Sequence, residues 1–111
     1  MAVPATYNLK FVRGDTLTLN ITITSDGTTP VNIAGRSYRA QIRYEKNAST
    51  IAASFTCTPN VSTGVVNCVL SAANSATLTD GPAFWDFEET NTGVVTTILA
   101  GKVTVLADVT R

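Results

Sequence analysis

Few residues in this chain could do chemistry, and the carboxylates of Asp86 and Glu88 are the first to consider. The sequence contains no histidine, which excludes Ser-His-Asp and Cys-His catalysis and every zinc site that needs a histidine ligand. Asp86 and Glu88 alternate with aromatic residues, so on a strand they would share one face about 7 Å apart, within the range of the paired acids of inverting glycosidases. The solvated outer face of an ordinary strand has the same pattern. We therefore expect a solvated face and no catalytic residues.

Cys57 and Cys68 are the other reactive pair. A turn at Ser62-Thr63 would place them opposite each other on neighbouring antiparallel strands, where Cβ atoms are about 4.5–5.5 Å apart, close to disulfide geometry. Residues 1–4 lack the basic start and apolar stretch of a secretion signal, so we expect synthesis in a reducing cytosol, where two buried thiols are commoner than a bridge. The sequence leaves the disulfide open but favours reduced thiols. Two cysteines cannot complete a thiolate zinc site, and we expect neither a metal nor a cofactor.

Composition limits the partners. Lys plus Arg and Asp plus Glu number 8 each among 111 residues, so no positive field favours nucleic acid. No apolar run approaches the ~18 residues that suggest a membrane span. Only 14% of residues are charged, below the ~25–35% usual for a soluble surface. We therefore expect no nucleic acid and no membrane partner, and a surface partly covered by neighbouring proteins.

Alternation of apolar and polar residues dominates the sequence and predicts strands. Such runs cover residues 16–24, 37–45, 51–57, 66–70, 83–87, 94–99 and 102–109. The last two form one long strand or two short ones, with a bulge expected at Gly101 between them. The Ala-rich segment 71–78, with Ser71 as its N-cap, predicts a short helical crossover. We predict an all-β domain over residues 1–111, an immunoglobulin-like antiparallel β-sandwich of about seven to eight strands. The predicted core comprises Leu17, Leu19, Ile21, Ile23, Tyr38, Ile42, Phe55, Trp85 and Phe87.

Two sets of residues are candidates for contacts with a partner. For a protein partner they are Arg39, Gln41, Arg43 and Phe84, although a solvated strand face is the commoner explanation of the three polar residues. For a glycan they are the aromatic residues Tyr7, Tyr38, Tyr44 and Phe84. The tripeptide Arg13-Gly14-Asp15 matches the integrin-binding motif, but a tight turn between two strands accounts for it, and we expect that turn.

Over nearly its whole length the chain resembles a pattern of strands and turns in small structural proteins of tailed bacteriophages. In that pattern a strand is followed by a turn reading roughly D-G-x-P-x-D-L-T-G and by a strand ending in I-R. The matching segments are Phe11–Leu19, Asp26-Gly27, Pro30–Gly35, Ala40–Arg43, Gly64–Ser71, Ala83–Phe87 and Val95–Val105. The chain is similar to the N-terminal domain of phage baseplate upper proteins. Those domains are immunoglobulin-like sandwiches that anchor receptor-binding parts to the particle, and the resemblance implies the same fold for this chain.

The resemblance leads us to expect a non-enzymatic virion protein of the tail or baseplate region, made in the host cytoplasm. Its partners would be other virion proteins, in a homo-oligomer or a multi-copy assembly. The sequence ends at Arg111 without the fibre-linking extension of a baseplate adaptor, so a capsid decoration or cement protein is an alternative. A carbohydrate-binding module is an alternative from another class.

Overall fold

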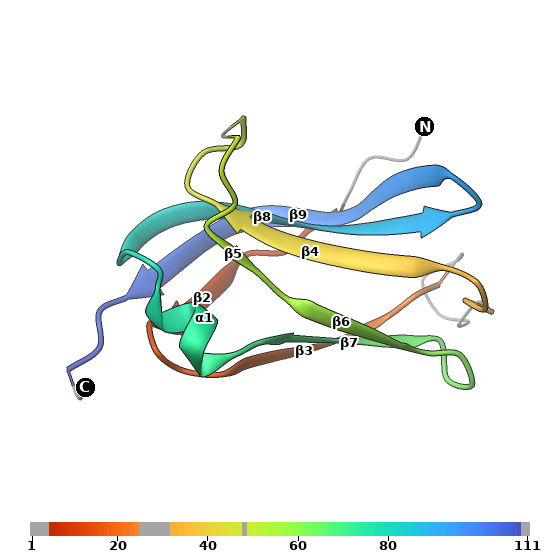
Figure 1. Ribbon diagram of the computed structural model, residues 1–111, viewed down its shortest axis with the longest axis horizontal. Helices are drawn as coiled ribbons and strands as arrows, with labels where there is room; N and C mark the ends of the chain where they lie inside the picture. The colour runs from red at the N-terminus through yellow and green to blue at the C-terminus, as the bar shows by residue number, and fades with distance from the viewer. Residues whose placement is uncertain (1–4, 25–31, 48, 110–111) are drawn as a thin grey trace.

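The computed structural model describes residues 5–24, 32–47 and 49–109 (Figure 1). Asp26-Gly27, Pro30 and Val31, which belong to the turn of the phage-like pattern, lie outside these residues. Nine strands and one helix are described: β1 Ala5–Thr6, β2 Leu9–Val12, β3 Leu17–Thr22, β4 Ser37–Arg43, β5 Ala53–Ser54, β6 Thr56–Asn60, β7 Val65–Leu70, α1 Ala72–Ala76, β8 Gly81–Asn91 and β9 Val94–Leu106. Because β1 and β5 have two residues each, the number of longer strands agrees with the prediction.

The strands form two open sheets that face each other (Figure 1). The large sheet has the order β1-β9-β8-β4-β5, with β2 also paired to β9, and the small sheet has the order β3-β7-β6. The chain crosses between the sheets after β2, β3, β5 and β7, so that β3, β6 and β7 form one layer and β4, β8 and β9 lie in the other, as in immunoglobulin-like sandwiches. The predicted fold class, an all-β sandwich with one short helical crossover, is confirmed.

Alternation places one side of each central strand in the core between the sheets. Ile23, Ile42, Phe55, Trp85 and Phe87 are buried, as predicted. Leu17, Leu19, Ile21 and Tyr38 were also predicted to be core residues, but they are only half-buried and pack against its margin. The three β3 side chains remain accessible because β3 is an edge strand with a neighbour on one side only. Tyr38 lies near the start of β4, where its hydroxyl reaches the Glu89 carboxylate.

The bulge in the final strand is not at Gly101. Phe87 pairs with Leu99 and Glu88 with Thr97, so Ile98 is the extra residue in β9. Gly101 has a different role: its missing side chain leaves room for the backbone carbonyl of Tyr7, which a Cβ atom at this position would overlap. The N-terminal strands β1 and β2 pair in parallel with β9 on either side of this contact.

The crossover helix α1 carries the chain from β7 in the small sheet to β8 in the large sheet, as expected. Ser71 caps it by accepting a hydrogen bond from the Asn74 amide at 3.1 Å. The buried Ser75 hydroxyl accepts a hydrogen bond from the Gly14 amide at 2.7 Å, and Arg13 pairs with Asp108 at 2.9 Å. The Arg13-Gly14-Asp15 segment is therefore the predicted turn, held against the domain. No helix in the described part of the chain is long and apolar enough to span a membrane.

Candidate binding groove on the outer face of the large sheet

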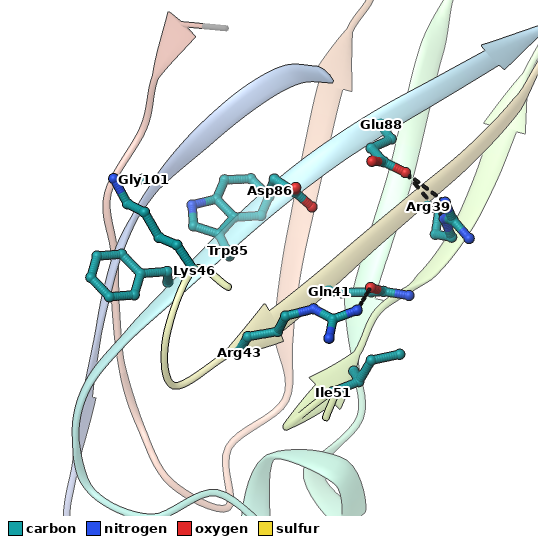
Figure 2. Close-up of a pocket in the computed structure, with 10 residues that line it drawn as sticks. Arg39, Gln41, Arg43, Lys46, Ile51, Trp85, Asp86, Glu88 and Gly101 are labelled. Carbon is teal, nitrogen blue, oxygen red and sulfur yellow. Dashed lines mark hydrogen bonds and ion pairs between the residues drawn. The ribbon is translucent and has the colours of Figure 1, made fainter. Parts of the chain in front are cut away.

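The outer face of β4 and β8 carries a groove, here called the β4–β8 groove, with a volume of about 460 Å³ (Figure 2). Arg39 pairs with Glu88, Gln41 with Asp86, and Arg43 with Phe84 across the two antiparallel strands. Their side chains point outward because the alternate residues of both strands fill the core. The complete lining is Arg39, Gln41, Arg43, Lys46, Ile51, Phe84, Trp85, Asp86, Glu88 and Gly101.

All four residues predicted to contact a protein partner line this groove, together with both predicted acids. Antiparallel pairing of β4 with β8 brings them together from positions more than forty residues apart in sequence. The sequence placed Arg39, Gln41 and Arg43 on one face, but it contained no signal that Phe84, Asp86 and Glu88 would lie beside them. The predicted solvated face is thus a continuous polar surface with a hollow in it.

Two of the residues that line the groove form an ion pair. Arg39 donates to Glu88 Oε1 from Nη2 at 2.8 Å and from Nε at 3.2 Å. The Arg39 side chain is 65% exposed, so solvent screens the pair and its contribution to stability is small. The pKa of Arg39 is raised, first by the hydrogen bonds to Glu88 and then by the charge of that carboxylate. Figure 2 shows this pair beside the Arg43–Gln41 hydrogen bond, whose length is 3.2 Å.

The surroundings of Asp86 disfavour its charged form. Burial raises the pKa of its carboxyl group above the ordinary value, and the nearby charge of Glu88 raises it further. Arg43 and Arg39 act in the opposite direction. The Glu88 carboxylate is already bonded to Arg39. A ligand in the groove would therefore meet one carboxylate that is already paired and a second, that of Asp86, whose charged form is disfavoured. The arrangement suits polar recognition by paired charges.

Lys46 and Ile51 enter the groove from the connection between β4 and β5, and sequence reasoning missed both. The ammonium group of Lys46 lies 5.3 Å from the ring centroid of Phe84, in cation–π geometry. The turn after β4 folds this lysine back over the sheet. The alternation of apolar and polar residues does not predict this contact, because Lys46 lies beyond the end of β4.

The aromatic residues proposed for glycan binding are dispersed. Tyr38 stacks on Phe87 with centroids 5.5 Å apart and donates a hydrogen bond to Glu89 at 2.7 Å. Tyr7 contacts Trp85 edge-on, and Tyr44 accepts a hydrogen bond from the Thr79 amide. Of the four candidates, only Phe84 lines the β4–β8 groove.

Cys57 and Cys68 lie directly opposite each other on β6 and β7, as their spacing predicted. Their sulfur atoms are 3.3 Å apart, and both thiols are free.

Within the residues that the structure describes, no three His, Cys, Asp or Glu side chains group closely enough to hold a metal ion. No protein-family profile matches the chain, and no curated protein matches it in sequence.

Proposed function

We propose that this chain is a non-enzymatic structural protein of a tailed-phage virion, a module of the tail or baseplate region that docks on other virion proteins. The observation that carries the proposal is the β4–β8 groove, in which Arg39, Gln41, Arg43 and Phe84 converge on one rigid sheet face. Arginine and aromatic residues are enriched at protein interfaces, and here the arginines are held in place by Glu88 and Gln41. The resemblance to phage baseplate domains supplies the biological setting.

The rest of the surface is consistent with packing in an assembly. The chain is only 14% charged and has no net charge, so contacts with neighbours carry little cost in desolvating ions. The edge strands β3 and β6 leave backbone groups that another subunit could pair with. These features support multi-copy assembly beside a specific contact through the groove.

The first test is the number of copies of this protein per purified particle, measured by quantitative mass spectrometry against the major capsid protein. A small number per particle supports a tail or baseplate module. A ratio near one copy per capsid subunit supports the decoration alternative instead. Absence from particles contradicts both structural roles.

The second test asks whether the groove makes the contact. The Arg43→Ala/Phe84→Ala variant should fold but be lost from particles assembled in its presence. Lys10→Ala is the matched control, because Lys10 is exposed on β2 and does not line the groove. Equal incorporation of the groove variant and the control would contradict docking through this surface.

Glycan binding is the second candidate function, and the same groove is the observation that favours it. A hollow of about 460 Å³ lined by Phe84 and planar polar side chains has the size of a small-ligand site. Saturable binding to a host glycan that Phe84→Ala abolishes without unfolding the protein would support this function. Tyr7→Ala, which removes an exposed ring outside the groove, should leave such binding intact.

A further inference from the structure

The two cysteines occupy one cross-strand position inside the sandwich. Cys57 on β6 pairs in register with Cys68 on β7, and the Cys68 thiol donates to the Cys57 sulfur at 3.3 Å. Cys68 is fully buried, whereas Cys57 is half-buried on the edge strand of the small sheet. Cys57 is therefore the more accessible of the two cysteines.

The type of strand pairing favours a bond between these sulfurs. Pro59 pairs with Val66 on the same two strands, and proline has no amide hydrogen, so this pair cannot exchange both ladder hydrogen bonds. Hydrogen-bonded and non-hydrogen-bonded pairs alternate along an antiparallel ladder, which makes Cys57–Cys68, two positions away, a non-hydrogen-bonded pair as well. Such pairs have Cα atoms about 4.5 Å apart, within the range that a disulfide spans.

The two thiols differ in reactivity. The pKa of Cys57 is lowered, first because the Cys68 thiol donates a hydrogen bond to its sulfur, although burial acts in the opposite direction. The pKa of Cys68 is raised by that same hydrogen bond and by burial. Because the thiolate is the attacking species, Cys57 is the thiol that reacts first, and it is also the accessible one.

We propose that Cys57 and Cys68 form an intrachain disulfide when the folded protein meets a small-molecule disulfide such as oxidised glutathione. The Cys57 thiolate attacks one glutathione sulfur, which forms a mixed disulfide and releases one glutathione. Cys68 then loses its proton and attacks the Cys57 sulfur, which forms the protein disulfide and releases the second glutathione. Two protein thiols are oxidised, and one glutathione disulfide is reduced to two thiols that carry the two protons.

The bond would join an edge strand covalently to the centre of its sheet. β6 is held in the small sheet by β7 alone, so its free side exposes it to fraying and to pairing with other chains. A Cys57–Cys68 bond would suppress fraying of β6 from β7 once the protein leaves a reducing compartment. The proposal does not depend on the virion role, since it follows from the hairpin alone.

The test uses the reduced, folded protein incubated with oxidised glutathione and then quenched with acid. Thiols are alkylated under denaturing conditions, and the intact mass is measured. We expect a monomer that is lighter by two hydrogen atoms and accepts no alkyl groups. A protein that keeps both thiols, stops at a glutathione adduct, or forms disulfide-linked dimers would overturn the proposal.

Two variants test the order of attack. Cys68→Ala should retain one glutathione, because the second attack is removed, whereas Cys57→Ser should gain neither a glutathione nor a bond because Cys68 is buried. Equal glutathione uptake by the two variants would overturn the assignment of Cys57 as the attacking thiol. The wild-type mass decides whether the disulfide forms, even if Cys68→Ala does not fold.

Discussion

Replacing Gly101 with alanine tests how the N-terminal strands are held on the C-terminal strand. A Cβ atom at position 101 would overlap the carbonyl of Tyr7, and this carbonyl accepts a hydrogen bond from the Trp85 indole at 2.7 Å. The Tyr7 amide is itself bonded to the Ala100 carbonyl at 2.9 Å. The backbone at Tyr7 must therefore move to admit the methyl group, and the indole hydrogen bond is lost or weakened.

The expected cost has two parts. Forcing a methyl group into a packed site costs about 1–3 kcal/mol. Trp85 is only 3% exposed, and a buried donor left without a partner costs about 1–3 kcal/mol more. The free energy of unfolding should thus fall by about 2–6 kcal/mol, a large share of the ~5–15 kcal/mol typical of a domain. Tm should fall by at least ~8 °C, since each kcal/mol shifts Tm by roughly 4–8 °C in small domains.

The assay is chemical and thermal denaturation followed by fluorescence, because Trp85 is the sole tryptophan in the chain. Its native emission should also change as the indole loses its acceptor. Gly35→Ala is the matched control: its φ is +78° and no atom lies near the added methyl group, so it should cost only the ~1–2 kcal/mol of a left-handed conformation. A Gly101→Ala variant no less stable than Gly35→Ala, with unchanged emission, would refute the reasoning.

Three further predictions concern single side chains. Ser75→Ala should lower the free energy of unfolding by about 1–3 kcal/mol, because the Gly14 amide loses its acceptor. Urea denaturation measures this change, and an unchanged free energy of unfolding would contradict the role of Ser75 in holding the turn. Arg39→Ala should leave the urea midpoint nearly unchanged, since its pair with Glu88 is exposed and screened by solvent; a clear fall of the midpoint would mean that the pair has a structural role. The pKa of Asp86 is raised, so the folded state binds the proton of this carboxyl group more tightly than the unfolded state does. The protonated group therefore adds stability at pH values below its ordinary pKa of 3.8. That stability is lost as the pH rises through the raised pKa. Asp86→Asn should therefore stabilise the protein more at neutral pH than at acid pH, and a stability difference from wild type that does not vary with pH would argue against burial as the cause.

Local patterns in the sequence determined most of the strands and the contacts between strands that are neighbours in sequence. Alternation located β3, β4, β7 and β8 because a strand with one buried face repeats every two residues. The pairing of Cys57 with Cys68 followed from the short turn between them, which sets the register of a hairpin. The Ser71 cap marked the start of α1 for the same local reason.

Contacts between segments that are far apart in the sequence were determined only by the tertiary structure. The half-burial of Leu17 and Leu19 depends on β3 being an edge strand, and the role of Gly101 depends on the parallel pairing of the N-terminal strands with β9. The β4–β8 groove needs the register between two strands that are far apart in sequence, together with a turn that folds Lys46 over Phe84. Periodicity reports which side of a strand faces the core, but it does not specify which strand becomes its neighbour, because that choice is made by packing over the whole domain.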